Sequence, residues 1–226
     1  MKRTRAIPAA AVVVFVAAWS GVRLSGHRGV PVPAGESSAP TAADRVPIPA
    51  PPLPSVRIPQ RVPPFTLTGL DGKPRSIAQF QGHSLIINFW ATWCGPCRRE
   101  IPLLQSIASA WRGRHFAVVG VAVDRRENVA KFARRFKIRY PLMSGEQDAL
   151  AVATAFGVAT PAFPFTVFSD ERGRIVALYL GELHRPQIDL ILGVVQALNA
   201  NRIALPAARR AVATGLARLD SDTAAG

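Results

Sequence analysis

The feature that most constrains the fold is a junction between a buried strand and a helix, and it holds both cysteines of the chain. Leu85–Trp90 is an apolar run of strand length, which is typical of a central strand buried on both faces. Residues 93–97, Trp-Cys-Gly-Pro-Cys, follow, and apolar residues then recur at helical spacing from Ile101 to Trp111. The pattern therefore predicts that the cysteines lie at the N-terminal end of a helix.

This placement predicts the chemistry of the two thiols. Free backbone N–H groups and the helix macrodipole stabilise a thiolate at Cys94. Two intervening residues allow a disulfide to close across the first helical turn, where Pro96 is tolerated. We expect the more exposed Cys94 to be the nucleophile and Cys97, one turn inside, to be the resolving thiol.

Two other uses of the cysteines are disfavoured. A zinc site would need two further ligands from the four histidines, but the chain has no second CxxC and no HxxxH spacing. A purely structural disulfide is poorly motivated, because a four-residue loop restrains the unfolded chain very little. Reversible dithiol–disulfide exchange is the interpretation that the pattern favours.

Strands and helices alternate over the rest of the domain. Strands are predicted at Phe65–Thr68, Leu85–Trp90, Phe116–Val123, Phe165–Phe168 and Arg174–Leu180, the last two forming a hairpin. Helices are predicted at Ile101–Trp111, Asn128–Ile138, Gln147–Phe156 and Gln187–Leu198. This order predicts an α/β fold with a central sheet and helices on both faces.

At this point the sequence resembles the TlpA/ResA-like exported thiol–disulfide oxidoreductases of the thioredoxin superfamily. The resemblance is carried by Asn-Phe-Trp-Ala-Thr-Trp-Cys-Gly-Pro-Cys at 88–97, Arg-Arg-Glu-Ile-Pro at 98–102, Gly-Val at 157–158, Phe-Pro-Phe-Thr-Val at 163–167 and Asp-Glu-Arg-Gly-Arg-Ile at 170–175. It spans about residues 63–200. It implies a thioredoxin fold with a mixed sheet, and a redox-active disulfide with no metal and no other cofactor.

The resemblance also implies a set of site residues. Pro164 corresponds to a cis-proline that packs beside the cysteines and presents backbone to substrate; Pro161 competes for this role, but the strand follows Pro164 directly. The catalytic residues implied are Cys94, Cys97 and Glu100. The substrate-binding residues implied are Trp93, Gly95, Pro96, Phe163 and Pro164.

Glu100 and Asn88 mark where this chain differs from cytoplasmic thioredoxins. Those proteins usually carry a buried aspartate at the position of Asn88, so the acid that assists the second cysteine is missing there. Glu100, three residues past Cys97, matches a family acid that assists proton transfer. A partly buried Glu100 would act as a base toward Cys97, whereas an exposed one would only complement the helix dipole.

The function implied is reduction of disulfides in periplasmic proteins, with apocytochrome c and copper-site proteins as family substrates. Gly95-Pro96 suits reduction, and an enzyme of this kind needs a membrane thiol-reductase as electron donor. A disulfide oxidase or isomerase is the alternative among enzymes. A non-catalytic copper or haem thiol chaperone is the alternative from another class, although 2 methionines and 4 histidines provide few metal ligands.

The N-terminal third has the composition of an export segment and a spacer. Residues 1–24 combine a basic start with the apolar run Ala6–Val22, which favours a retained anchor over a signal cleaved near Ser20. Residues 25–62 form a Pro-rich disordered linker. We expect the domain at 63–200 to lie at the periplasmic face of a bacterial inner membrane, or free in the periplasm after cleavage. Residues 201–226 allow a helix of unknown role.

The net charge of +14 is spread along the chain, which disfavours a nucleic-acid-binding protein. A basic run at residues 125–139 lies opposite an apolar face formed by Val129, Phe132 and Phe136. The run is therefore interpreted as a solvated helix face. Steering of acidic partners or contact with anionic lipid remains the alternative.

Overall fold

A computed structural model describes residues 58–111, 115–158 and 162–224. The expected export segment and most of the Pro-rich linker lie outside these residues. The described chain contains one seven-stranded sheet in the order β2-β1-β5-β4-β3-β6-β7. Its strands are β1 (Thr66–Gly69), β2 (Pro74–Ser76), β3 (Ser84–Trp90), β4 (Phe116–Val123), β5 (Leu142–Gly145), β6 (Phe165–Ser169) and β7 (Ile175–Leu180).

The sheet is mixed, as predicted. Strand β4 runs parallel to β3 and β5, whereas β6 is antiparallel to β3 and β7 is antiparallel to β6. At the other edge β1 is antiparallel to both β5 and β2. All seven residues of β3 are buried, which confirms the central position that its continuous apolar run predicts.

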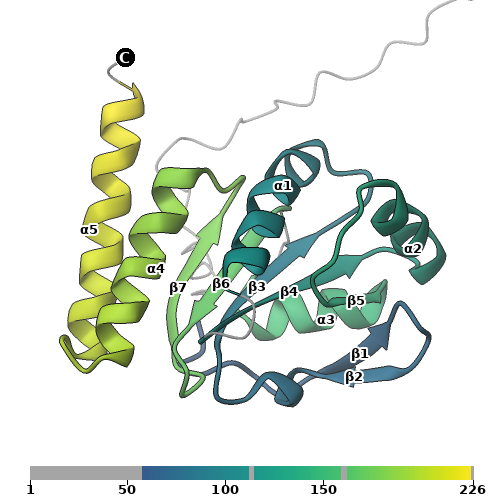
Figure 1. Cartoon of the computed structure of the whole chain (residues 1–226), viewed down its shortest axis with the longest axis horizontal. Helices are drawn as coiled ribbons and strands as arrows, with labels where there is room; N and C mark the ends of the chain where they lie inside the picture. Colours follow the sequence, from purple (N-terminus) through teal and green to yellow (C-terminus); the bar gives the residue numbers. More distant parts are fainter. Residues whose placement is uncertain (1–57, 112–114, 159–161, 225–226) are drawn as a thin grey trace, which may run out of the picture. The chain divides into compact units, whose positions relative to one another are not determined.

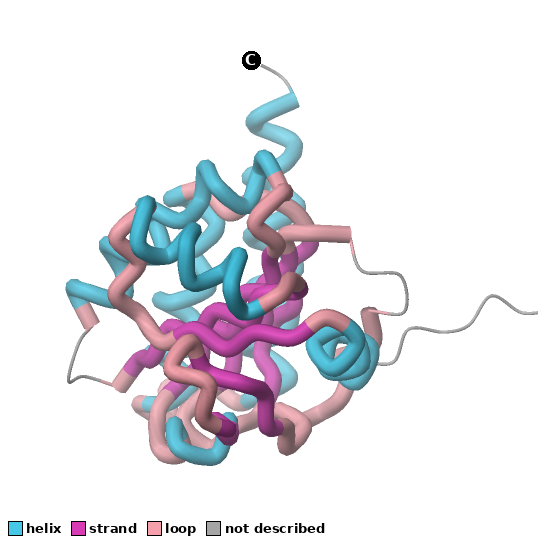
Figure 2. The backbone as a smooth tube through the Cα atoms, turned by 90° about the vertical axis from the view of Figure 1, so that its right-hand side faces the viewer, coloured by secondary structure: helices cyan, strands magenta, loops and turns pink. Residues whose placement is uncertain are grey.

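Helices cover both faces of this sheet (Figure 1). They are α1 (Gly95–Ala110), α2 (Arg126–Arg135), α3 (Gln147–Ala155), α4 (Arg185–Asn199) and α5 (Leu205–Ala224), with a 3-10 turn η2 (Ile77–Phe80). Buried residues of α1, α2 and α4 share a core on one face, and those of α3 and η2 share a core on the other. Figure 2 shows the strands as the layer between the helices.

The short strand β2 was not predicted, and three further details differ from the sequence prediction. Strand β5 went unpredicted because Leu-Met-Ser-Gly is short and contains no β-branched residue. Helix α2 begins and ends earlier than predicted, and Lys137 just after it adopts a left-handed φ of 52°. Phe136, expected on the buried face, is 38% exposed because the helix has already ended there.

The two ends of the described domain meet at strand β7. Residues 60–62, on the linker side of the expected boundary, pair with the β6–β7 turn: Ile175 N–H donates to the Gln60 carbonyl at 3.0 Å. Helix α5 buries Ala208 and Val212 in the core shared with α4. Arg209 of α5 donates to the Ile175 carbonyl at 2.6 and 2.9 Å. The C-terminal helix therefore packs as part of the domain.

Among the described helices, none combines the length and the apolar character that crossing a bilayer requires.

Candidate active site

The cysteines form a disulfide at the junction of β3 and α1. Their Cα atoms are 5.3 Å apart, and both cysteines of the chain are used. Cys94 is the N-cap residue of α1, and its Sγ accepts a hydrogen bond from the Cys97 N–H at 3.2 Å. Pro96 lies in the first turn, where a missing N–H costs nothing. The structure therefore confirms that the two cysteines can form a disulfide across the first helical turn.

The two cysteines differ in their exposure to solvent. Cys94 is 5% exposed, and Cys97 is completely buried. The Cys94 sulfur also lies at the positive end of a 16-residue helix, next to N–H groups that have no intrahelical partner. Both facts favour a thiolate at Cys94 and access of a reactant to that sulfur first.

The segment before β6 forms the second side of the site. The Phe163–Pro164 peptide bond is cis, as the resemblance implied. The Phe163 ring meets the 69% exposed Trp93 ring edge to face, with centroids 6.2 Å apart. The Pro164 carbonyl accepts a hydrogen bond from Gly181 N–H at 2.8 Å. Phe163 makes no hydrogen bond to any described residue, so its backbone N–H and carbonyl are available to a partner.

Glu100 is buried in the helical turn that follows Cys97. Its side chain is only 1% exposed, so an exposed first-turn acid is excluded. Asn88 Nδ2 donates to Glu100 Oε1 at 2.8 Å, and the Leu183 N–H donates to Oε2 at 3.0 Å. The same Asn88 Nδ2 donates to Thr166 Oγ1 at 3.0 Å. Asn88, on β3, thus helps to fix the carboxylate of Glu100 in the turn after Cys97.

Burial raises the pKa of the Glu100 carboxyl from 4.5 to about 7. The hydrogen bonds from Leu183 and Asn88 act in the opposite direction, and the negative charge of Glu182 adds to the increase. Loss of hydration dominates because no described residue places a cation against the carboxylate. A carboxyl with this pKa exchanges its proton near neutral pH.

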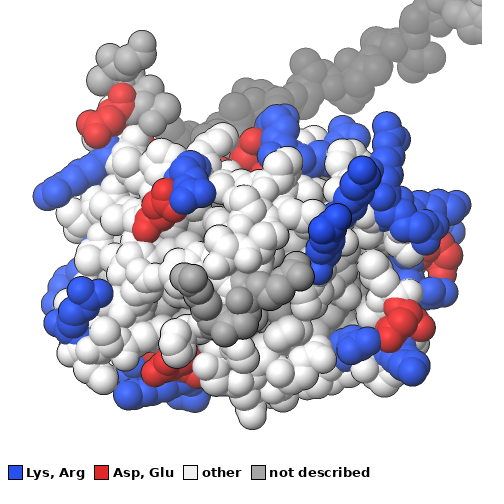
Figure 3. Space-filling model, in the orientation of Figure 1, with Lys and Arg blue, Asp and Glu red and all other residues white. Residues whose placement is uncertain are grey.

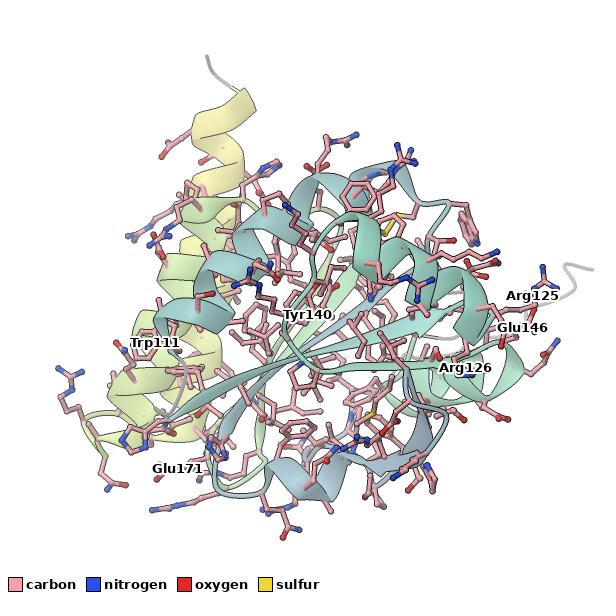
Figure 4. The ribbon with its side chains drawn as sticks, turned by 45° about the vertical axis from the view of Figure 1, so that its right-hand side comes forward. Trp111, Arg125, Arg126, Tyr140, Glu146 and Glu171 are labelled. Atoms are coloured by element: carbon pink, nitrogen blue, oxygen red, sulfur yellow. A yellow bond between two sulfur atoms is a disulfide. The ribbon has the colours of Figure 1, made fainter. Side chains whose placement is uncertain are left out.

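Tyr140 lies near enough to Glu100 to be affected by its charge, and sequence reasoning missed this residue. Among the described residues, Asn88 Oδ1, Trp90 Nε1 and Tyr140 Oη are buried and find no hydrogen-bond partner. Figure 4 places Tyr140 in the middle of the domain, whereas Arg125 lies at its margin. Burial raises the pKa of the Tyr140 hydroxyl, and the charge of Glu100 adds to this increase. The sequence offered one indication that another side chain packs closely here: Gly120 is the only residue without a side chain in the apolar run of β4.

A salt bridge lies on one side of the disulfide. Arg99 Nε and Nη2 donate to the Glu182 carboxylate at distances from 2.5 to 3.1 Å. Arg98, the preceding residue, is exposed and makes no ion pair with a described residue. Within the described ranges there is also no cluster of three or more His, Cys, Asp or Glu that could hold a metal ion.

Comparisons with known proteins agree with this geometry. The model of the AhpC/TSA family matches residues 58–180. The thiol-disulfide oxidoreductase ResA of Geobacillus thermodenitrificans is 30% identical over 135 residues, 59% of this chain and 75% of that protein. The thioredoxin-like protein YneN of Bacillus subtilis is 28% identical over 58% of this chain and 75% of that protein.

Solved structures give the same result. A thiol:disulfide interchange protein of the thioredoxin family from Chlorobium tepidum is 31% identical, with a TM-score of 0.51 over 55% of this chain and 88% of that one. A secreted thiol-disulfide isomerase from Corynebacterium glutamicum is 26% identical, with a TM-score of 0.53 over 60% and 85%. With this fold and this cysteine pair, the chain belongs to the AhpC/TSA family and is a thioredoxin-fold thiol–disulfide oxidoreductase.

Proposed function

We propose that this enzyme works as a disulfide reductase on proteins outside the cytoplasm, with Cys94 as nucleophile, Cys97 as resolving thiol and Glu100 as proton acceptor. The observation that carries the proposal is the buried Glu100 carboxyl in the turn after Cys97, with a pKa of about 7. A base of this strength matches proton transfer from a buried thiol near neutral pH.

The reaction is written from the reduced enzyme. The Cys94 thiolate attacks one sulfur of the substrate disulfide, that S–S bond breaks, and the departing substrate sulfur takes up a proton. Cys94 is now joined to the substrate in a mixed disulfide; Glu100 accepts the proton of the Cys97 thiol, the resulting thiolate attacks the Cys94 sulfur, the mixed disulfide breaks, and the leaving substrate sulfur takes up that proton. The substrate leaves as a dithiol, two electrons have passed to it, and the Cys94–Cys97 disulfide remains, which is the form the structure contains.

Substrate contact is assigned to the exposed rim of the disulfide. Trp93 and Phe163, whose rings contact each other, offer aromatic surface, and Gly95 and Pro96 belong to the first turn of α1. The free backbone groups of Phe163, held in place by cis Pro164, suit pairing with an extended substrate segment. These residues form the proposed substrate-binding set.

An extracytoplasmic location rests on the N-terminal residues and on the relatives. Residues 1–24 have the composition of an export signal or anchor, residues 25–62 that of a spacer. One relative is described as secreted. The reductase then requires a membrane thiol donor to regenerate its dithiol, and apocytochrome c and copper-site proteins are candidate substrates through the resemblance alone.

Two measurements test the proposal. The reduction potential of the Cys94–Cys97 pair should lie near about −270 mV, as in reducing thioredoxins, whereas a value near about −120 mV would identify an oxidant and overturn it. Cys97→Ser should accumulate mixed disulfides through Cys94 with target proteins. Cys94→Ser is the matched control and should trap none; equal trapping by both variants would contradict the assigned roles.

A further inference from the structure

A groove lies beside the disulfide, between the start of α1 and helix α2. Thr92, two residues before Cys94, and Arg98, directly after Cys97, line it together with residues of α2. Its volume is about 370 Å³. Because Thr92 and Arg98 flank the dithiol along the chain, an occupant of this groove would lie next to Cys94.

Two aromatic rings form the apolar part of the groove. Phe132 and Phe136 stack with centroids 4.2 Å apart, and Phe132 also contacts the Trp90 ring at 5.1 Å. Phe132 is partly buried, but Phe136 is 38% exposed although nothing in its sequence pattern predicts exposure. The rings therefore offer contact area that the domain itself leaves uncovered.

The rim of the groove is cationic. Arg98, Lys131 and Arg135 are exposed and line it, and none of them forms an ion pair with a described residue. Arg135 instead lies over the Phe136 ring, with its guanidinium carbon 5.7 Å from the centroid. Figure 3 shows Lys and Arg side chains gathered over α2.

The carboxylates near the groove and the disulfide already have hydrogen-bond or ion-pair partners. Asp124 accepts hydrogen bonds from the Thr92 hydroxyl, from Asn128 Nδ2 at 2.9 Å and from the Arg125 N–H at 2.7 Å. Glu182, on the other side of the disulfide, is paired with Arg99. The two sides of the site thus differ in charge. On one side Arg99 is neutralised by Glu182, whereas the groove on the other side presents three cations to solvent.

We propose that this groove receives an acidic segment of the substrate polypeptide next to the disulfide that is being reduced. The proposal rests on the proposed reductase function and adds the substrate class. A polypeptide fits better than anionic lipid, because the cations converge on a hollow with an apolar floor beside the dithiol. A substrate must bring its disulfide to Cys94, which carries its flanking residues into the groove.

The physical effect is on encounter and orientation. Single exposed ion pairs contribute little free energy, but several cations around one cleft raise association rates of an oppositely charged partner by tenfold or more. At low ionic strength we expect an acidic substrate to react about tenfold faster than a basic one of the same length. Added salt should reduce the difference.

The experiment uses the full chain in its reduced form and two synthetic peptides, each with one internal disulfide. One peptide carries three Asp and the other three Lys around the cysteines. The test variant is Arg98→Glu/Lys131→Glu/Arg135→Glu. The control is Arg202→Glu/Arg210→Glu/Arg218→Glu, which reverses three exposed charges away from the groove. Second-order rate constants of peptide reduction are measured for each combination.

We expect the acidic-to-basic rate ratio to be about ten in the wild type and the control, and to fall to one or below in the groove variant. A ratio near one in the wild type, or an equal fall in both variants, would overturn the proposal. If the groove variant loses only its binding to phosphatidylglycerol vesicles and keeps the peptide ratio, the groove is a lipid contact and the proposal is also wrong.

A second readout separates this proposal from the reductase function. Binding of a fluorescent acidic peptide without cysteines is followed by anisotropy, and it should weaken about tenfold in the groove variant only. If neither disulfide peptide is reduced but this binding holds, the reductase assignment fails and the groove assignment stands. If reduction proceeds with no difference in binding, the groove assignment alone fails.

Discussion

The two faces of the central sheet come from the same strands but bury different chemistry. Alternate residues of β3 point to opposite faces: Ile87 and Phe89 join the core with α3, while Trp90 joins the core with α1. All four buried side-chain atoms without a partner among the described residues come from Asn88, Trp90, Tyr140 and Gln187, which belong to the α1 and α4 side. The α3 face therefore provides apolar packing, whereas the α1 face also buries the polar groups that include Glu100, the proposed proton acceptor.

The difference between the two faces shows where this domain accepts a loss of stability. A buried polar atom without a hydrogen bond costs about 1–3 kcal/mol, and a buried carboxyl resists ionisation. Two of these side chains lie near Glu100, since Asn88 donates to its carboxylate and the charge of Glu100 acts on Tyr140. We therefore expect substitutions on the α3 face to change stability alone, and substitutions on the α1 face to change the pH dependence of stability and of the thiols.

Phe89→Ala should give the largest effect. Phe89 is fully buried, stacks on Phe165 with centroids 4.3 Å apart and meets Phe156 edge to face at 5.4 Å. Removing this ring should lower the free energy of unfolding by about 3–5 kcal/mol, measured by urea denaturation of the oxidised protein. The pH dependence of Cys94 alkylation in the folded fraction should stay as in the wild type; a shifted profile would show that the two faces are coupled.

Glu100→Gln should remove a pH dependence of stability. The pKa of Glu100 is 4.5 when solvated and about 7 in the fold, so the folded state holds the proton more tightly. Stability is then greatest below about pH 4.5, falls as the pH rises to about 7, and is constant above. The loss is about 3 kcal/mol for a change of this size.

The measurement compares the free energy of unfolding of oxidised wild type and Glu100→Gln between pH 4.5 and 8. We expect the difference between the two proteins to change by about 3 kcal/mol over this range in favour of the variant. Glu127→Gln is the matched control, since Glu127 is exposed on α2. Parallel curves for wild type and Glu100→Gln would mean that the Glu100 carboxyl titrates as if solvated.

The location of the dithiol was predictable from the sequence because it depends on local patterns. The apolar run of β3, the N-cap position of Cys94 and the helical spacing of α1 all lie within about 25 residues of one another. Glu100 was identified through the resemblance, and its burial, which the structure provides, was left open between a buried base and an exposed helix acid. The cis bond at Pro164 was expected from resemblance, whereas the contact between the Phe163 and Trp93 rings was not derivable from either segment alone.

The rest of the site depends on contacts between distant segments. Gly120 of β4 leaves the room that the Tyr140 and Trp90 rings occupy, Tyr140 lies near enough to Glu100 to be affected by its charge, and Glu182 reaches Arg99 from the turn after β7. The exposure of Phe136 follows from where α2 ends, which periodicity predicted too late. Such features need the register of the sheet, which single-sequence patterns do not provide.

Gly120→Ala should sharpen the comparison by overpacking the α1 face. An added Cβ would lie 2.5 Å from Leu142 Cδ2 and 3.1 Å from both Trp90 Nε1 and a Tyr140 ring carbon. The expected loss of unfolding free energy is about 1–3 kcal/mol. Gly193→Ala is the control, because its added Cβ meets no atom within 4 Å on the exposed side of α4. Equal stabilities of the two variants would show that the α1 face is loosely packed around Gly120.

Tyr140→Phe should give the smallest effect, and its sign is the informative part. The Tyr140 hydroxyl is buried and has no hydrogen-bond partner in the part of the chain that the structure describes, so its removal deletes an unsatisfied polar group and leaves the ring packing intact. We expect the variant to be as stable as the wild type or up to about 1 kcal/mol more stable by urea denaturation. A decrease of about 1 kcal/mol or more in the free energy of unfolding would mean that the Tyr140 hydroxyl makes a hydrogen bond in solution. The α1 face would then be a fully satisfied polar network, and its contrast with the α3 face would lie in ionisation alone.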